Sequence, residues 1–433
     1  GGAKTLKKYQ DKNVYEAAKE RIKFVFENFE KVYVSFSGGK DSSVVLNLAL
    51  DYMREHREKR KLGILFLDLE GQYSATINFI REILLDNAEY LDVYWVCLPL
   101  NLRNSVSVFQ PFWTCWDIDN RDKWVREYPD FPGVITEKNN PFPFFRKQME
   151  FEEFVPEFGK WYSNGKKTAC LVGIRSDESL NRYRTIKNRI KGKMCGKNWT
   201  TKISGEFYNV YPIYDWNVRD VWIGNAKLGW KYNPLYDQFY KAGVPLASQR
   251  ICQPYGDDQR IGLNLYRVIE PATWAKVVNR VSGANFGNIY CGNRILGYRK
   301  VKLPKGHTWK SYCKMLLATL PKEMANHYRK KFKKFMLWWY RKGSPVDEES
   351  LKELPPEAVA TDKKSPYLET IVRYKRIPDC LDNGLEQKKL APTWRRMCAC
   401  ILKNDYICVG LSFSQTKHQQ ERMKQLIEKY RNL

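Results

Sequence analysis

The chain has 433 residues, of which 43% are hydrophobic, so it can form two or three packed domains and is not disordered throughout. Its formal net charge of +26 indicates a polyanionic partner, with nucleic acid as the first expectation. No apolar run is long enough to span a bilayer, and the 11 cysteines include no CxxC pair. We therefore expect a cytoplasmic protein with free thiols that does not enter the membrane.

Helices and strands are predicted to alternate over the first hundred residues, because apolar residues at helical spacing take turns with short apolar runs. In chain order the pattern predicts helix, strand, helix, strand, helix and strand over residues 13–29, 32–36, 43–57, 62–69, 74–85 and 93–98. This alternation is typical of a parallel sheet whose strands are joined by crossover helices.

The alternation breaks at residues 101–165, which are rich in Trp, Phe, Pro and Asn and show no clear period. We interpret them as an insertion that covers the ligand edge of the sheet. Strands are predicted again at 168–174 and 207–213, and the pattern from residue 218 onward is mainly helical. The predicted fold is α/β, with a five-stranded, mainly parallel sheet and a helical C-terminal region.

Four parts are expected along the chain. An α/β nucleotide-binding domain is predicted over 1–240 and a helical extension over 241–341. Residues 342–366 hold Pro, Glu, Asp, Ser and Lys with few apolar positions, as a linker would. A last helical segment is expected over 367–433, ending in a charged helix from about residue 415.

The sequence Ser37-Gly38-Gly39-Lys40-Asp41-Ser42 lies between the first predicted strand and the helix that follows it. Two glycines let the backbone turn tightly, and the start of a helix offers unpaired amides and a positive dipole end. The hydroxyls of Ser37, Ser42 and Ser43 add donors, and Lys40 adds charge. The alternative is an ordinary Gly-Gly turn before a capped helix, but the six residues together favour a site for phosphate, pyrophosphate or sulfate.

This loop resembles the PP-loop of the adenine nucleotide α-hydrolase superfamily. Its members include N-type ATP pyrophosphatases, the small subunit of ATP sulfurylase and phosphoadenosine phosphosulfate (PAPS) reductase. The resemblance implies a fold of that type and a loop that grips the pyrophosphate of ATP, or the equivalent anion of PAPS.

Two further strand ends resemble the PAPS reductase branch. Asp68 falls where that family has a DTG-like signature, although the next residues here are Leu69-Glu70-Gly71. The segment from Gly173 to Arg182 resembles the family pattern G-[IV]-R-x-x-E-S-x-x-R. Arg175 and Arg182 suit phosphate or sulfate through their planar donor forks, while the plainer interpretation is a helix start stabilised by acidic residues. The stretch Asn233-Pro234-Leu235-Tyr236-Asp237 fits the same family further along.

The predicted site residues fall into three groups. Nucleotide or phosphate binding is expected of Ser35, Ser37, Gly38, Gly39, Lys40, Asp41, Ser42, Ser43, Asp68, Gly173, Arg175 and Arg182. Catalytic roles are expected of Lys40, Asp41, Arg175, Arg182 and Cys252. Mg²⁺ is expected at Asp41, Asp257 and Asp258, although the last two residues would equally cap the helix that follows them.

The C-terminus departs from PAPS reductases, because it lacks their ECGIH-like motif with its reactive cysteine. Cys252 is the candidate replacement; the alternative is a small buried hydrophobe. We do not expect an Fe–S cluster, because the spacing of the candidate ligands is irregular: Cys115, Cys195, Cys252 and Cys291. Over most of its length the chain resembles the immunoglobulin-binding regulator A (IbrA/YbdN-like) branch, which implies a ParB-like partner protein.

Two basic segments, 182–202 and 329–342, carry aromatic residues among their cations. Cations contact phosphates and rings stack on bases, so both segments are candidates for nucleic-acid binding; the alternative is a solvated helix face.

Three functions are compatible with these features. The leading hypothesis is an ATP-using enzyme that cleaves ATP at the α-phosphate with Mg²⁺, transfers adenylate and releases pyrophosphate, with nucleic acid as a candidate acceptor. The second is a PAPS reductase-like sulfonucleotide reductase. The third is a regulator that senses a nucleotide and binds DNA with a ParB-like partner, without turnover.

Overall fold

The computed structural model describes residues 11–104, 112–188, 191–256, 262–281, 303–319, 322–366, 369–402, 405 and 408–413. The chain divides into two compact units. Unit 1 comprises Gly1–Arg103 and Phe112–Arg280, and unit 2 comprises Asn104–Pro111 and Val281–Leu433.

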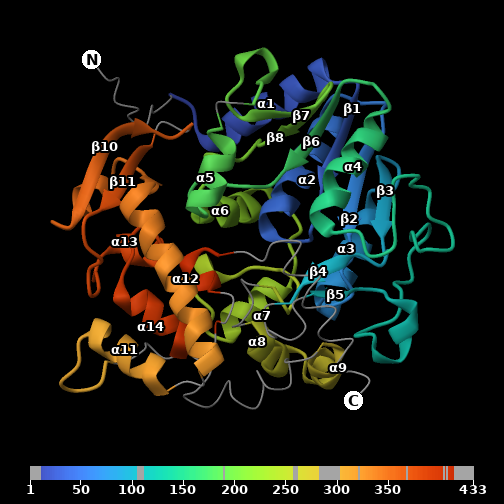
Figure 1. The fold of residues 1–433 in the computed structure, drawn as a ribbon. Coiled ribbons are helices and arrows are strands. Elements are labelled where there is room, and N and C mark those ends of the chain that lie inside the picture. The colour runs from blue at the N-terminus through green and yellow to red at the C-terminus, as the bar shows by residue number, and fades with distance from the viewer. Residues whose placement is uncertain are drawn as a thin grey trace. The chain divides into compact units, whose positions relative to one another are not determined.

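A six-stranded sheet forms the centre of unit 1 (Figure 1). Its strands, in spatial order, are β3 (Leu91–Val96), β2 (Leu62–Leu67), β1 (Lys31–Ser35), β6 (Thr168–Val172), β8 (Phe207–Val210) and β7 (Thr200–Ser204). All neighbouring pairs are parallel except β7 and β8. The α/β fold with a mainly parallel sheet is therefore confirmed, with six strands instead of five.

The strand missing from the prediction is β7, whose sequence is Thr-Thr-Lys-Ile-Ser. It begins at the end of the basic segment 182–202 and pairs antiparallel with β8 across a turn at Gly205, which has φ +50°. An edge strand pairs on one side only, so it does not need the apolar run by which the central strands were recognised.

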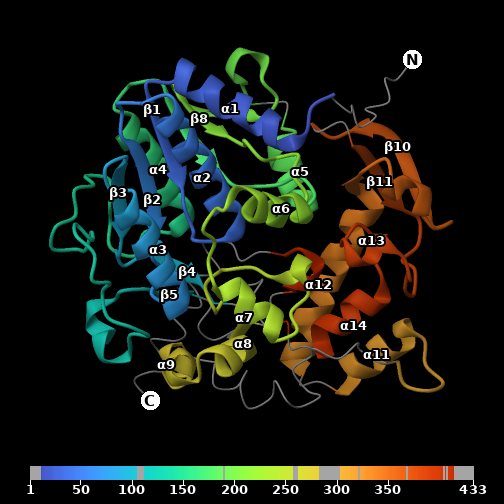
Figure 2. The same cartoon turned by 180° about the vertical axis from the view of Figure 1, so that it is seen from behind.

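The connections place β1 and β6 at the point where the strand order reverses. After α1 (Val14–Asn28), helix α2 (Lys40–Glu55) joins β1 to β2, and α3 (Ser74–Asp86) joins β2 to β3. Helix α4 (Phe151–Ser163) then returns the chain to β6, on the other side of β1. Figures 1 and 2 show α4 on one face of the sheet and α1 and α2 on the other. The carboxyl ends of β1 and β6 therefore form a topological switch point, where open α/β sheets bind ligands.

The insertion predicted at 101–165 is only partly irregular. It begins with the short hairpin of β4 (Asn101–Arg103) and β5 (Phe112–Thr114), followed by the 3₁₀ helix η1 (Ile118–Lys123). Its last part is α4, a regular crossover helix whose ring of Phe158 lies 5.3 Å from that of Tyr33 on β1. The dense aromatic residues of this segment concealed the helical period.

The other helices of unit 1 lie between the end of β6 and Arg280 in the chain. They are α5 (Leu180–Ile186), α6 (Val218–Leu228), α7 (Leu235–Lys241), α8 (Gly262–Ile269) and α9 (Pro271–Arg280), with the 3₁₀ helices η2 (Met194–Gly196) and η3 (Leu246–Ser248). Unit 1 therefore continues past residue 240, where the sequence placed the end of the nucleotide-binding domain. The Tyr266 hydroxyl on α8 donates to the Gly71 carbonyl at 3.1 Å, which is one contact that ties this region to the sheet.

Unit 2 combines helices with a small antiparallel sheet in the order β10-β11-β9. Its elements are α11 (Trp309–Thr319), α12 (Lys322–Arg341), β9 (Ser344–Val346), η5 (Ser350–Glu353), β10 (Ala358–Lys364), β11 (Thr370–Tyr374), α13 (Gly384–Gln387), α14 (Trp394–Leu402) and η6 (Val409–Leu411). Residues 342–366, expected to be a linker, instead supply β9, η5 and β10. They were misjudged because β10 is an edge strand with mostly charged or exposed side chains. The helix predicted from residue 415 lies outside the described residues. Among the helices that the structure describes, none has the length and apolar character needed to cross a membrane.

Candidate nucleotide site at the β1–β6 switch point

The loop after β1 is held in shape by its own side chains. Gly38 has φ +74°, and a Cβ there would lie 2.8 Å from Cδ1 of Ile80, so only glycine fits. The hydroxyls of Ser37 and Ser42 are 3.0 Å apart, and the Ser37 amide donates to Oγ of Ser42 at 3.2 Å. The Ser43 hydroxyl donates to the Gly39 carbonyl at 2.7 Å. The six-residue motif therefore forms a compact turn that opens directly into α2.

Several amides of this turn are available for an anion. Within the described part of the chain, the amides of Gly38, Asp41 and Ser42 donate to no protein acceptor. Asp41 and Ser42 belong to the first turn of the 16-residue helix α2, whose amide end carries a partial positive charge. This geometry suits a phosphate or pyrophosphate.

Helix α7 supports the loop from the other side. The amide of Lys40 donates to the Tyr236 hydroxyl at 2.9 Å, and the Asn233 side chain donates to the Gly38 carbonyl at 3.2 Å. Burial raises the pKa of the Tyr236 phenol well above its ordinary value, so this hydroxyl stays protonated. Sequence reasoning had assigned no role to these two residues, although the family-like stretch 233–237 was the available signal.

Lys40 lies at the base of the loop and is 5% exposed. Its Nζ is 3.2 Å from Oδ2 of Asp41 and donates to the Gln249 carbonyl at 3.3 Å. The same ammonium lies 5.6 Å from the ring centroid of Tyr236. A buried lysine held in this way supplies a fixed positive charge to an anion that binds the neighbouring amides.

The loop after β6 is bound to the first turn of α2. Arg175 is buried, and its Nε donates to Oδ1 of Asp41 at 2.7 Å while its Nη1 donates to Oδ1 of Asp177 at 2.5 Å. The Nη2 of Arg175 donates to no described protein acceptor and so remains available for a ligand. Gly173 permits this approach, because a Cβ there would lie 2.7 Å from the backbone nitrogen of Ser42.

Two of the predicted residues lie at the margin of this site. Ser35 ends β1, where it pairs with Leu65 and Val172. The Arg182 side chain is 47% exposed, and its Nε lies 3.8 Å from Oε2 of Glu178. Arg250 lies 3.9 Å from the same carboxylate, so Glu178 groups two cations near the loop after β6.

Asp68, predicted to bind nucleotide, is buried and hydrogen-bonded to several groups of the protein. Its buried carboxylate accepts from the Trp95 indole at 2.9 Å, from the Glu70 amide at 3.1 Å and from the Arg126 guanidinium. Its carbonyl accepts from the Trp116 indole at 2.6 Å. The carboxylate therefore positions residues of the insertion.

Glu70 has a similar structural role that sequence reasoning missed. Its side chain is fully buried and accepts from the amides of Trp116 and Val125 at 2.7 and 3.0 Å. Arg280 on α9 binds both of its oxygens, at 2.6 and 3.1 Å. The Leu-Glu-Gly that replaces the family's Thr-Gly was the signal for this difference.

Cys252 is half-buried in the neighbourhood of the loop. It lies close enough to interact electrostatically with Tyr73 and Tyr236, whose pKa values are raised chiefly by burial. Two buried polar atoms of the same region, Oη of Tyr73 and Oε1 of Gln249, have no hydrogen-bond partner among the residues that the structure describes. Such atoms are commonly satisfied by water or a ligand.

The structure describes two of the other candidate cysteine ligands. Cys115 is buried with a raised pKa, and Cys195 is exposed. Cys291, Asp257 and Asp258 lie outside the described residues. Among the residues that the structure describes, no three His, Cys, Asp or Glu side chains are grouped closely enough to hold a metal ion.

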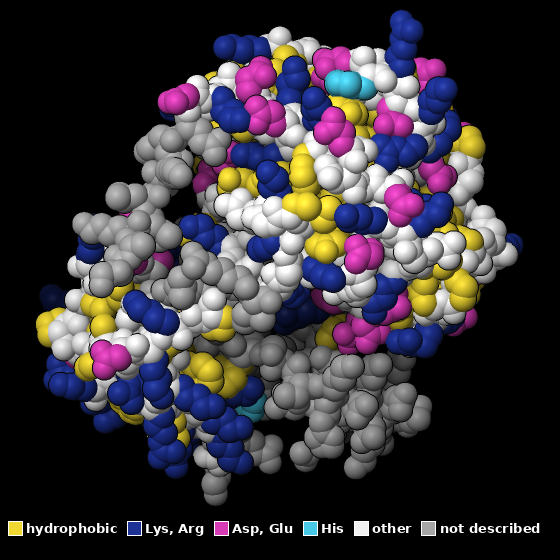
Figure 3. Space-filling model, turned by 90° about the horizontal axis from the view of Figure 1, so that it is seen from above, with side chains coloured by type: hydrophobic (Ala, Val, Ile, Leu, Met, Phe, Trp, Pro, Cys, Tyr) yellow, Lys and Arg dark blue, Asp and Glu magenta, His cyan; other side chains and the backbone are white. Residues whose placement is uncertain are grey.

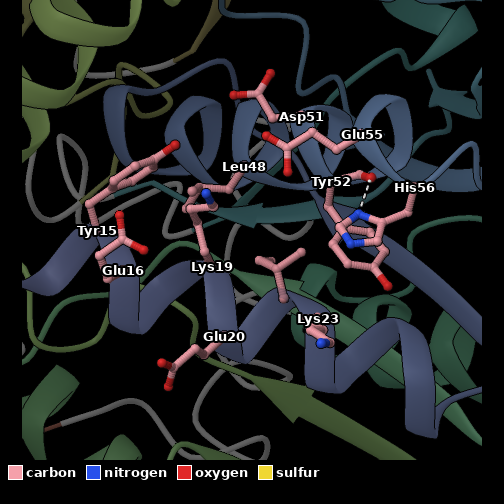
Figure 4. Close-up of a pocket in the computed structure, with 11 residues that line it drawn as sticks. Tyr15, Glu16, Lys19, Glu20, Lys23, Leu48, Asp51, Tyr52, Glu55 and His56 are labelled. Carbon is pink, nitrogen blue, oxygen red and sulfur yellow. Dashed lines mark hydrogen bonds between the residues drawn. The ribbon is translucent and has the colours of Figure 1, made fainter. Parts of the chain in front are cut away.

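A separate hollow lies between α1 and the second half of α2 (Figure 4). Its lining on α2 runs from Leu48 to His56, which is about 12 to 24 Å along the helix from Lys40. It mixes acidic and basic side chains, including Glu16 and Lys19 of α1. It is therefore distinct from the loop at the switch point.

Comparison with protein families divides the chain into two matched regions. Residues 31–92 and 135–243 match the phosphoadenosine phosphosulfate reductase domain. Residues 243–422 match a domain of unknown function, DUF3440. The first match includes the loop after β1 and the loop after β6.

Similar proteins cover both regions. The chain is 40% identical to the uncharacterized protein YbdN of Escherichia coli (strain K12) over 412 residues, which are 94% of this chain and 91% of that protein. It is 24% identical to sulfate adenylyltransferase subunit 2 of Rhizobium tropici, over 56% of this chain and 72% of that protein. Among solved structures, a phosphoadenylyl-sulfate reductase of Candida auris in a phosphate complex aligns with a TM-score of 0.31 and 12% identity, over 57% of this chain and 98% of that chain.

The geometry at the switch point and these matches lead to one assignment. The chain belongs to the same family as YbdN, and in this chain a region that matches the PAPS reductase domain is followed by a region that matches DUF3440.

Proposed function

We propose that this protein binds ATP at the β1–β6 switch point and cleaves it at the α-phosphate, transferring adenylate to an acceptor and releasing pyrophosphate. The observation that carries the proposal is the turn at residues 37–42, where free amides at the start of α2 lie beside the buried cations Lys40 and Arg175. This arrangement would bind a pyrophosphate group more strongly as negative charge develops on it during bond cleavage.

The proposed reaction needs no covalent bond between the protein and the substrate. A nucleophilic oxygen or nitrogen of the acceptor forms a bond to the α-phosphorus, and the bond between that phosphorus and the bridging oxygen breaks. The electron pair leaves with pyrophosphate, and the acceptor loses a proton to solvent or a base. The amides of residues 38, 41 and 42 would hold the leaving group, while Lys40 and Arg175 offset its charge.

Mg²⁺ does not fit Asp41 in this arrangement. One oxygen of Asp41 accepts from Arg175 at 2.7 Å and the other lies 3.2 Å from the Lys40 ammonium. A metal ion at this carboxylate would have to displace a cation, so we assign no step to one there. Mg²⁺ that accompanies ATP is commonly held by the phosphates themselves together with water.

The test is incubation with ATP and candidate acceptors, with pyrophosphate and AMP as readouts. Lys40→Met should reduce pyrophosphate release by about 100-fold or more, since one group that stabilises developing charge is worth that much. Lys59→Met, a change at an exposed lysine, is the matched control and should leave the rate unchanged. Absence of ATP binding would reject the proposal, and binding without pyrophosphate release would favour the nucleotide-sensing regulator.

A sulfonucleotide reductase is the second candidate, because the half-buried Cys252 is a neighbour of Tyr236, whose hydroxyl accepts from the Lys40 amide of the loop. The Cys252 thiolate would attack the sulfur of PAPS, forming an S–S bond and releasing adenosine 3′,5′-bisphosphate, and an external thiol would then free sulfite by forming a disulfide. Sulfite release in the presence of a thiol donor, abolished by Cys252→Ser, would support this candidate. No sulfite with any thiol donor would reject it.

We further propose nucleic acid as the acceptor, on the strength of the net charge of +26. Pyrophosphate release should then require added DNA or RNA. A ParB-like partner stays a prediction of the resemblance, and co-purification of the two proteins would test it.

A further inference from the structure

Helix α12 in unit 2 has two sharply different faces. Its buried side chains recur every three or four residues and form one stripe, namely Ala325, Tyr328, Phe332, Phe335 and Trp339. This stripe packs inside unit 2, where the Trp339 ring lies 5.5 Å from that of Tyr374 on β11. The opposite face is therefore fixed as the solvent face of the helix.

The solvent face is densely basic. No acidic residue occurs from residue 326 to residue 342, a stretch that ends one residue after α12. The exposed cations are Arg329, Lys330, Lys333, Lys334, Arg341 and Lys342. None of them forms an ion pair with a carboxylate of the described residues. Lysine and arginine side chains also gather at the lower left of the space-filling view, in the part that belongs to unit 2 (Figure 3).

This concentration of charge has a cost in the free protein. Lys330 is three residues before Lys333 and four before Lys334, and pairs of like charges at these spacings destabilise a helix. A face that serves only solubility carries both signs of charge. A run of one sign on a rigid helix indicates a polyanion that neutralises it.

Exposed aromatic rings border the basic face. The Trp338 side chain is 49% exposed and that of Tyr340 is 38% exposed. The Lys342 ammonium lies 5.3 Å from the Trp338 ring centroid, so a cation and a ring are presented together. A single strand of nucleic acid offers both phosphates and exposed bases. It matches this combination, because cations bind the phosphate backbone and rings stack on the bases.

An anionic membrane surface fits this helix less well. A helix that lies on a membrane must turn its apolar face into the lipid. The apolar face of α12 is already buried within unit 2 through Phe332, Phe335 and Trp339. Only charge and the two bordering rings remain outside.

We propose that the solvent face of α12 is a binding surface for single-stranded nucleic acid, with its cations on the phosphates and Trp338 on a base. This surface lies in the DUF3440 region, outside the loop that binds nucleotide in the proposed function. Binding requires no ATP, so its outcome is separate from that of the ATP reaction.

The test is fluorescence anisotropy of labelled oligonucleotides with the full chain, across a range of salt concentrations and without ATP. Single-stranded DNA and RNA and a duplex of the same length are compared. The variant Lys330→Gln, Lys333→Gln, Lys334→Gln should bind single strands at least about tenfold more weakly and lower the salt slope by about 2, since each phosphate contact contributes about 0.7. Trp338→Ala should weaken single-strand binding and leave the salt slope unchanged.

The matched control removes the same charge from unit 1 by Lys59→Gln, Lys138→Gln, Lys227→Gln, all at exposed positions. It should retain wild-type binding. Equal loss in both triple variants would mean that net charge alone acts, and would overturn the proposal. Wild-type binding by the α12 variant, or tighter binding of the duplex than of the single strand, would also overturn it. Vesicles with anionic lipid are a further arm: a loss confined to vesicles would assign the face to membranes and reject nucleic acid.

Discussion

Arg175 and Asp41 join the two loops of the switch point, since Nε of Arg175 donates to Oδ1 of Asp41 at 2.7 Å. Arg175 follows β6 and Asp41 begins α2, and both side chains are largely buried. The pair fixes the distance between the two strand ends, and it leaves the Arg175 Nη2 available. Arg175, which the sequence marked as a candidate anion ligand, is thus also a structural link between the loop after β6 and the start of α2.

Breaking this pair should destabilise the protein. Arg175→Met leaves the Asp41 carboxylate with Lys40 as its remaining partner, and removing one partner of a buried pair costs about 3–5 kcal/mol. Urea unfolding measures the loss in the free energy of unfolding. Arg182→Met is the control; because Arg182 is largely exposed, its cost should stay within about 0.5 kcal/mol. Equal costs for the two variants would contradict the role given to Arg175.

Adding a methyl group at Gly173 should disturb the same contact. Gly173→Ala places a Cβ 2.7 Å from the Ser42 nitrogen and 2.8 Å from the Asp41 carbonyl carbon, so β6 and α2 must move apart. We expect a loss of about 1–3 kcal/mol in stability and weaker binding of ATP, measured by urea unfolding and calorimetry. Gly192→Ala is the control, because its nearest neighbour would be an ordinary 3.4 Å away. Unchanged ATP affinity in a folded Gly173→Ala protein would separate the loop from nucleotide binding.

The buried pair of Glu70 and Arg280 should hold the insertion and α9 on the sheet. Glu70→Gln removes the charge but keeps the shape, and leaves the Arg280 guanidinium buried without a counter-ion. We expect a loss of about 3 kcal/mol or more, and faster proteolysis of the segment that contains Trp116 and Val125. Limited proteolysis followed by mass spectrometry would locate the cuts. Protection equal to that of the wild type would show that other contacts hold the insertion.

Stability should fall at alkaline pH in a way that depends on Tyr236. Burial raises the pKa of its phenol above the ordinary value of 10.0, so between that pH and the raised pKa the unfolded chain loses a proton that the folded chain keeps. This contribution is fully present below pH 10 and is lost as the pH rises, by up to about 1.4 kcal/mol per pH unit. Tyr236→Phe should reduce the slope of unfolding free energy against pH above 10. The control Tyr240→Phe changes a ring that is 70% exposed and should leave the slope as in the wild type; the same slope in both variants would contradict the prediction.

Local pattern alone predicted much of the fold. The strands β1, β2, β3, β6 and β8 were found because each is a short apolar run bounded by polar residues, and such runs are buried on both faces of a parallel sheet. The loop from Ser37 to Ser42 was found because its chemistry is contiguous in sequence. Strand β7, helix α4 and the small sheet of unit 2 were missed, since edge position and aromatic packing hide the period of their side chains.

Tertiary structure decided which partners surround each polar residue. Asp68 and Arg175 look alike in sequence, as charged residues at strand ends, yet Asp68 is engaged by Arg126 and Trp95 whereas Arg175 lies against Asp41. Tyr236 contacts the loop through its hydrogen bond with the amide of Lys40, a residue 196 positions away in the sequence. The sequence by itself determined the turn from Ser37 to Ser43, because the side chains that shape it from within lie in seven consecutive residues. Only the folded chain determined what surrounds that turn, because a buried charge takes its role from the partners that packing brings to it.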